Sequence, residues 1–101
     1  MVKTTISWKR QNIDTPWWTT ITTNTYKDYV KAKYGVVGKR HSSKLTMSKD
    51  GLYLTSETIF ADEAAFEEFS SDPMIRAWIN TRREYCTKNN IQESDRIIQL
   101  Y

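Results

Sequence analysis

The sequence predicts an α+β sandwich with the element order strand–helix–strand–strand–helix–strand. Three observations support this prediction. Residues 2–9 alternate between apolar and polar side chains, as a half-buried strand does. Asp50-Gly51 supplies a turn between two extended stretches, as in a β-hairpin. Two runs of helical periodicity then lead to a short alternating segment at the end of the chain. At 101 residues the chain forms one domain, 1–101.

The first helix has two possible starts. Thr15 followed by Pro16 is typical of a helix entry, with Thr as N-cap and Pro at the first helical position. However, residues 19–23 are all β-branched and form helices poorly, which favours a start only near Asn24 or Thr25. Gly35 is expected to end this helix, since glycine is common just past the last turn.

Three further strands are predicted after this helix. They cover residues 36–48, 52–60 and 96–101, and residues 91–95 form a connector before the last one. By alternation, Leu45 and Met47 point to one face of the sheet and Lys44 to the other.

The second helical region is predicted to be broken. Asp62 is a suitable N-cap, and Glu63 follows in the first turn, where the helix dipole favours acidic groups. The phase of the apolar face then changes at Asp72-Pro73, where Asp can cap and Pro can begin a new helix. Residues 89–90 close the second piece.

This order of elements defines a ferredoxin-like βαββαβ sandwich, with a four-stranded antiparallel sheet and both helical regions on one face. The side chains expected in its core are Val2, Ile6, Trp8, Ile21, Tyr29, Leu45, Met47, Leu52, Leu54, Phe66, Phe69, Ile75, Trp78, Ile79, Ile98 and Leu100.

Composition excludes several classes of protein. No apolar run is long enough to span a membrane, and the N-terminus lacks the apolar block of a secretory signal. The lone Cys86 cannot form an internal disulfide, so a reducing, cytoplasmic location is expected. Without a Cys/His cluster, no metal site is predicted, and no cofactor is expected. The basic first half and acidic second half either form a basic face for an anionic partner or interleave in the sheet and cancel.

The segment DGLYLTSETIFADEAAFEEFSSDPMIRAW resembles the dimeric α/β-barrel superfamily, in particular its antibiotic-biosynthesis-monooxygenase-like branch. The resemblance implies a homodimer packed sheet against sheet, with a small pocket either between each sheet and its helices or within the shared barrel. It also implies that a cofactor-independent oxygenase is one of the possible activities. The haem-degrading members use an axial histidine, and the only histidine here, His41, does not match that pattern. The bias toward Lys, Thr, Asn, Ile and Tyr is similar to that of small proteins from marine tailed phages.

The open face of the sheet holds the predicted ligand or interface residues. Tyr53 and Glu57 form its obvious polar pair; Glu57 is either a general base, if desolvated, or a solvated strand carboxylate. His41 is a further catalytic candidate, with surface placement as the alternative. Trp17, next to Trp18, either docks a partner or is buried under the connector. The residues proposed for a ligand or an interface are Trp17, Tyr53, Glu57 and Tyr101.

These observations predict a small soluble accessory or binding protein and favour an interaction protein over an enzyme. The protein is expected to form a homodimer through the sheet face, and a protein partner is a further expectation. The alternative is a cofactor-independent monooxygenase-like or isomerase-like enzyme with a pocket under Trp8 and Trp18. A second alternative is single-stranded nucleic-acid binding on the open sheet face, although no segment matches the aromatic motif of RNA-recognition modules.

Overall fold

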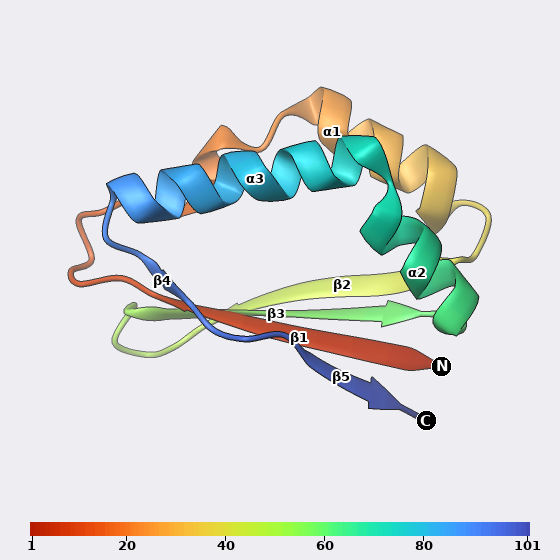
Figure 1. Ribbon diagram of the computed structural model, residues 1–101. Coiled ribbons are helices and arrows are strands. Elements are labelled where there is room, and N and C mark those ends of the chain that lie inside the picture. Colours follow the sequence, from red (N-terminus) through yellow and green to blue (C-terminus); the bar gives the residue numbers. More distant parts are fainter.

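The computed structural model describes all 101 residues as two layers, with the helices packed on one face of an antiparallel sheet (Figure 1). This is the predicted ferredoxin-like α+β fold. The strands are β1 (Val2–Lys9), β2 (Arg40–Met47), β3 (Tyr53–Phe60), β4 (Gln92–Glu93) and β5 (Ile97–Leu100). The helices are the 3-10 turn η1 (Trp18–Ile21), α1 (Asn24–Val30), the π-helical turn η2 (Lys31–Gly35), α2 (Glu63–Ser71) and α3 (Pro73–Lys88).

Strands β1 and β3 form the centre of the sheet. They pair antiparallel over their whole length, from Val2 opposite Phe60 to Lys9 opposite Tyr53. Strand β2 pairs with the far side of β3, while β4 and β5 share the free side of β1. The chain termini therefore lie side by side (Figure 1), and the Tyr101 amide donates to the Met1 carbonyl over 2.9 Å.

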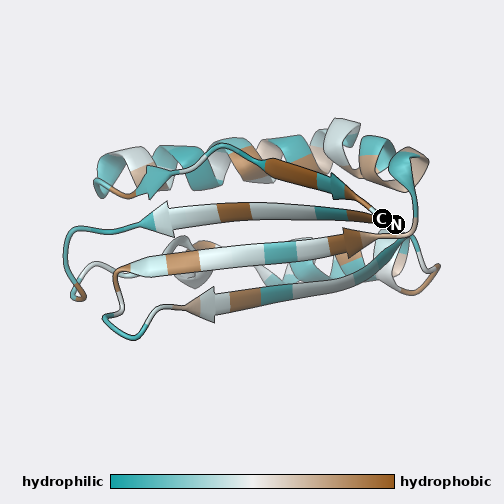
Figure 2. Cartoon of the chain, turned by 90° about the horizontal axis from the view of Figure 1, so that it is seen from below, coloured by the Kyte–Doolittle hydropathy of each residue, from teal (hydrophilic) through white to brown (hydrophobic).

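The register confirms the predicted division of the sheet into two faces. The helix-facing side of β1 carries Val2, Ile6 and Trp8, all buried. Leu54 lies opposite Trp8 and Ile98 opposite Thr4, so both share that face. The other face is open; Figure 2, seen from below, shows hydrophilic and hydrophobic residues mixed along its strands.

The outer strands correct the predicted core. Leu45 and Met47 on β2, and Ile98 and Leu100 on β5, were expected to be buried but are 45–62% exposed. They point toward the helical layer, as predicted, but the helices cover mainly β1 and β3. The core instead includes Tyr34, Phe60 and Ile91, which the alternation pattern did not select.

The first helical region begins late, as the β-branched run favoured. Helix α1 starts at Asn24, and its N-cap is Thr23, whose hydroxyl accepts from the Tyr26 amide at 3.2 Å. Thr15 is therefore not a helix cap. Trp17 and Trp18 are both buried, so of the two alternatives for Trp17 the structure shows burial. Trp17 has an extended backbone before the 3-10 turn, so the two adjacent rings are not fixed to the spacing of an α-helix.

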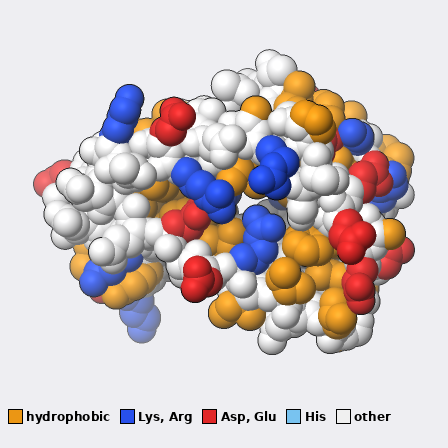
Figure 3. Space-filling view, viewed as in Figure 1, with side chains coloured by type: hydrophobic (Ala, Val, Ile, Leu, Met, Phe, Trp, Pro, Cys, Tyr) orange, Lys and Arg blue, Asp and Glu red, His pale blue; other side chains and the backbone are white.

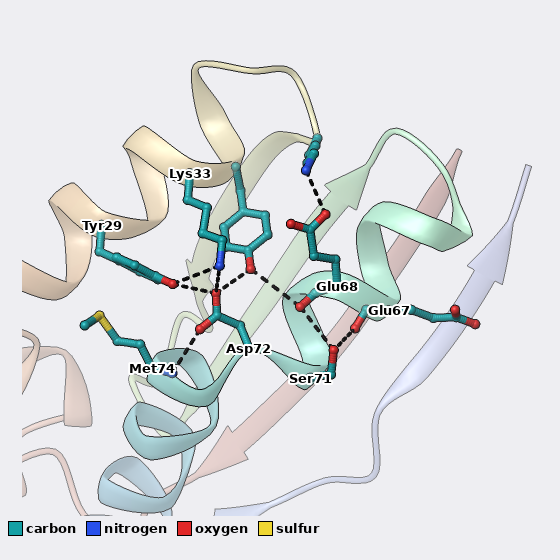
Figure 4. Close-up of polar contacts among 9 residues, drawn as sticks. Tyr29, Lys33, Glu67, Glu68, Ser71, Asp72 and Met74 are labelled. Atoms are coloured by element: carbon teal, nitrogen blue, oxygen red, sulfur yellow. Dashed lines mark hydrogen bonds and ion pairs between the residues drawn. The ribbon is translucent and has the colours of Figure 1, made fainter.

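The predicted break at Asp72 is confirmed, and several hydrogen bonds hold it in place. Figure 4 shows Tyr29 and Lys33 reaching the Asp72 carboxylate at the junction of α2 and α3. Asp72 Oδ2 accepts from the hydroxyls of Tyr34 and Tyr29, at 2.5 and 2.7 Å, and from Lys33 Nζ at 2.9 Å. Asp72 Oδ1 caps α3 by accepting from the Met74 amide at 2.9 Å. One buried carboxylate thus joins the first helical region to the second.

The last connector contains an element that was not predicted. Residues 92–93 form β4 within the expected connector, next to the end of β1. Two hydrogen bonds with Ser7 fix Ser94 just beyond it: the Ser94 amide donates to the Ser7 carbonyl at 2.8 Å, and the Ser7 amide to Ser94 Oγ at 2.9 Å. None of the helices has the length and apolar character needed to cross a membrane.

Candidate functional site

A cavity of about 400 Å³ lies between the sheet and the helices. Aromatic rings from three parts of the chain line it. The Trp8 and Trp18 rings are 4.9 Å apart, Trp78 is 6.3 Å from Trp18, and Tyr26 is 5.1 Å from Trp78. Phe69 also lines this space. These flat, rigid walls suit a planar aromatic ligand, because aromatic rings stack favourably at such distances.

The charged groups that line this cavity are all cationic. Arg40, Arg82, Arg96, Lys27 and Lys31 contribute to its lining, whereas no Asp, Glu, His or Cys does. The cavity therefore has a positive potential that its own walls do not neutralise, which favours an anionic ligand.

Arg40 reaches the cavity because of an irregularity in β2. Arg40 pairs with Phe60 and Ser42 with Ile59, so His41 is an extra residue at a β-bulge. Without the bulge, Arg40 would share the open face with Ser42 and Lys44. The bulge moves it to the helix-facing side, where its guanidinium carbon lies 5.9 Å from the Phe69 ring centre.

Arg40 has no partner in the protein. Its side chain forms no hydrogen bond or ion pair, and its Nε is buried. Burial lowers the pKa of Arg40, an effect that Tyr26 opposes. A guanidinium stays charged in proteins, so this is a half-buried cation without a counter-ion.

Arg82 is held more firmly. Its guanidinium carbon lies 4.9 Å from the Trp8 ring centre and 5.5 Å from that of Trp18. Its NH2 group donates to Glu93 Oε1 at 3.2 Å, the same oxygen that accepts from Trp8 Nε1 at 3.1 Å. Glu93, which does not line the cavity, therefore holds both Arg82 and Trp8 in position. Burial lowers the pKa of Arg82, and Glu93 opposes that effect.

Several polar groups in the cavity wall lack a hydrogen-bond partner. They are Trp18 Nε1, Arg40 Nε, Arg82 Nε and the Thr22 hydroxyl, all buried. The three nitrogens can only donate, so a ligand that satisfied them would have to supply acceptor oxygens. Buried donors are normally paired, and an unpaired cluster in a cavity is a physical indication of a ligand.

Tyr26 is the remaining titratable group of the cavity. Burial raises its pKa, although Arg40 and Arg82 counteract that effect. Tyr26 is therefore a proton or hydrogen-bond donor at neutral pH and not a base. The walls supply cations, donors and aromatic surface, but no side chain that would remove a proton from a ligand at neutral pH.

The residues selected from the sequence lie outside this cavity. Tyr53 and Glu57 are on the open face, where Glu57 pairs with Lys3 at 3.4 Å. His41 is exposed at the bulge, and Tyr101 is exposed at the chain end. Trp17 is buried with the Arg10 guanidinium 4.5 Å from its ring, so it does not present a docking surface. The structure does not bring these five residues together.

The sequence held one signal for this cavity. Arg82 falls on the same helical face as Ile75, Trp78 and Cys86. Charged side chains are rarely buried, so a cation on an otherwise apolar face indicates a buried binding or structural charge. The cavity lies beneath Trp8 and Trp18, where a pocket was predicted from the sequence.

Searches against protein-family models and curated protein sequences found no match. Solved structures match over the whole chain. The monooxygenase ActVA-Orf6 of Streptomyces coelicolor, in complex with nanaomycin D, has a TM-score of 0.69 at 13% identity over 99% of this chain and 86% of that chain. SnoaB, a cofactor-independent oxygenase from Streptomyces nogalater, has a TM-score of 0.67 at 9% identity, covering 99% and 91%.

A third structure, Rv0793 from Mycobacterium tuberculosis, has a TM-score of 0.64 at 14% identity, covering 100% of this chain and 95% of that chain. These likenesses define the fold of the chain: it is the fold seen in structures of antibiotic biosynthesis monooxygenases. The chain has this fold, as its sequence texture suggested; identities this low speak only to the fold.

Proposed function

We propose that this protein binds a small, planar aromatic anion in the cavity between its sheet and helices. The observation that carries the proposal is the combination of stacked rings with Arg40 and Arg82 and no acidic side chain in the lining. A carboxylate or phenolate on an aromatic ring would stack against Trp18 and Trp78, accepting from the Arg40 guanidinium, which has no partner, and from Nε of Arg82, which also lacks one. A cavity of about 400 Å³ is within the range of ligand pockets, roughly 300–1,000 Å³.

The test compares two ligands of the same shape and different charge. Isothermal titration calorimetry is expected to show 2-naphthoate binding to the wild-type protein at least about tenfold more tightly than neutral 2-naphthamide, a difference of roughly 1.4 kcal/mol. The Arg40→Gln variant is expected to lose most of that preference and to keep its affinity for the amide.

The matched control is Lys44→Gln, which removes the same charge from the same strand on the opposite face of the sheet. It should leave the preference for the anion unchanged. Arg40→Gln should fold at least as stably as the wild type, because it removes a buried cation that has no partner. Equal binding of the two ligands, or equal effects of the two variants, would contradict the proposal.

An enzyme is the second candidate, supported by the same two arginines and by the oxygenases that share the fold. In this reading, a phenolic or enolic substrate loses its proton to water because Arg40 and Arg82 stabilise the resulting anion. The anion would then reduce dioxygen, with one oxygen atom replacing two hydrogens of the substrate as a carbonyl and the other leaving as water. The structure offers no base for the first step, so the cations carry the electrostatic contribution.

Oxygen consumption separates binding from catalysis. Anthrone, a three-ring ketone with a phenolic enol form, should cause oxygen uptake above the buffer rate with wild-type protein and near the buffer rate with Arg40→Gln. Naphthoate binding without any oxygen uptake would reject the enzyme and leave the binding proposal standing.

We further propose a homodimer through the open face and the β5 edge of the sheet. Ile97 and Tyr53 are exposed on the open face, and Ile98 and Leu100 are exposed on β5. Such an uncovered apolar edge strand is a site where another chain can pair or pack. Light scattering should give twice the chain mass of 11.9 kDa.

The Ile97→Lys variant should return the particle to the mass of one chain. Ile13→Lys introduces the same charge at a comparably exposed residue in the loop after β1 and should leave the dimer intact. A monomeric wild type, or dissociation by both variants, would argue against this interface.

A further inference from the structure

A second hollow, of about 370 Å³, lies between α3 and the segment that joins β4 to β5. Its lining is mostly polar and includes Arg76 and Arg83 of α3 and Arg96 just before β5. Figure 3 shows Lys and Arg side chains gathered around a depression near the centre of this face. We refer to this hollow as the arginine pocket.

Most of the guanidinium N–H groups in the arginine pocket have no acceptor in the protein. Arg83 Nε donates to Glu93 Oε2 at 3.1 Å, and Arg76 NH1 donates to the Ser70 carbonyl at 3.1 Å. Arg96 forms no hydrogen bond or ion pair; its guanidinium carbon lies 5.8 Å from the Phe66 ring centre. The Ser70 hydroxyl, also in the lining, is buried and unpartnered.

The charges of the arginine pocket do not balance. Two carboxylates, Glu93 and Asp95, line it together with the three arginines. The lining therefore has an excess of one positive charge, and Glu93 is also shared with Arg82, so its carboxylate does not serve the pocket arginines alone. Burial lowers the pKa of Arg96, and the nearby Arg83 and Arg76 lower it further against the opposing effect of Glu93.

We propose that the arginine pocket binds a phosphate group. A phosphate monoester carries about −1.5 to −2 charges at neutral pH, opposite in sign to this excess. Its oxygens accept paired bonds from guanidinium groups, and Ser70 Oγ can donate another. Ile6, Ile79 and Arg96 line both the arginine pocket and the main cavity. The phosphate is therefore either free or a substituent of the aromatic ligand, and the second case rests on the proposed function.

The experiment follows the arginine Nε–Hε signals of the ¹⁵N-labelled full chain by NMR. Inorganic phosphate, added at constant ionic strength against a chloride reference, should shift the signals of Arg76, Arg83 and Arg96 and saturate with a dissociation constant of about 1 mM or below. Arg96→Gln should weaken this binding about tenfold. Ser70→Ala, which changes no charge, should weaken it severalfold, while the distant Lys49→Gln should change it less than twofold.

The two sources of phosphate are distinguished with 1-naphthyl phosphate. Tighter binding than inorganic phosphate, with shifts at the Trp18 and Trp78 indole signals, assigns the phosphate to the aromatic ligand; equal binding without those shifts assigns it to free phosphate. Shifts that rise linearly with phosphate, or that are unchanged in both Ser70→Ala and Arg96→Gln, overturn the proposal. If 2-naphthoate fails to bind while phosphate still saturates, the proposed function fails and the phosphate site stands.

Discussion

The Asp72→Ala variant is expected to lose about 3–5 kcal/mol of folding free energy, because it removes a buried charge from its partners. The Asp72 side chain is 1% exposed and accepts four hydrogen bonds, two of them from the Tyr29 and Tyr34 hydroxyls. Its loss leaves the buried Tyr34 hydroxyl with only the Glu68 carbonyl, at 3.5 Å, leaves the Lys33 ammonium with only the Tyr29 hydroxyl, and uncaps α3. Urea unfolding at neutral pH would measure the loss as a shift of midpoint at constant slope.

Asp62→Ala is the matched control for this measurement. Asp62 also caps a helix, accepting from the Ala65 amide at 2.8 Å, but it is exposed and has no other partner. Removing such a cap costs about 1 kcal/mol. The difference between the two variants therefore isolates the network between the helices from the cap. Equal losses would show that the hydroxyl and ammonium contacts of Asp72 contribute nothing to stability.

The same network predicts the behaviour of the protein in acid. Burial alone would raise the pKa of Asp72, but the hydrogen bonds from Tyr34, Lys33, Tyr29 and the Met74 amide outweigh it and hold the pKa well below its usual range. A carboxyl with a depressed pKa stabilises the fold above its unfolded pKa, about 3.9, and this stabilisation is lost as the pH falls toward the folded value.

Urea unfolding between pH 7 and pH 2 tests this sign. The wild-type free energy of unfolding should fall steeply below about pH 4, while that of Asp72→Asn, lower at neutral pH, should fall less over the same interval. Parallel curves for the two proteins would show that Asp72 does not contribute to acid unfolding.

Local signals in the sequence were sufficient to predict the fold. The alternation of residues 2–9, the turn at Gly51 and the caps at Asp62 and Asp72 each reflect chemistry confined to a few neighbouring residues. Gly51 has a φ of 75°, which glycine adopts without strain. Because each of these signals agrees with the others on one order of elements, the architecture followed from them.

The site was harder to predict, because it depends on contacts between distant segments. Arg40 lines the cavity only because His41 is an extra residue in β2, and alternation alone would have placed it on the open face. Nothing in the local sequence marks that bulge. Arg82 was accessible from the sequence as a cation on an apolar helical face, but its partner Glu93 lies in β4, a strand of two residues that periodicity cannot detect.

The exposed edges of the sheet have a related cause. Period-two patterns indicate which residues share a face, and here they did so correctly for Leu45 and Ile98. They do not indicate how far the helical layer extends across that face. Burial of the outer strands is set by the length and position of the helices, and in one chain those helices leave β2 and β5 partly uncovered.

Trp8 is the residue whose truncation is expected to affect both stability and binding. Its ring is 1% exposed, contacts Trp18 and Arg82, and donates from Nε1 to Glu93 at 3.1 Å. Trp8→Ala should cost about 3–5 kcal/mol, since it leaves a large void in the core. It should also enlarge the cavity and release Arg82 from one of its two rings, so affinity for 2-naphthoate should fall as well.

Trp8→Phe separates the two contributions of this side chain. It keeps an aromatic wall and the contact with Arg82 but removes the donor to Glu93. Thermal unfolding should place it between the wild type and Trp8→Ala, and calorimetry should show 2-naphthoate binding close to that of the wild type. If Trp8→Phe instead lost binding as completely as Trp8→Ala, the hydrogen bond to Glu93, and not the aromatic wall, would be what organises the cavity. If neither variant changed affinity, the ligand would not lie against Trp8 at all.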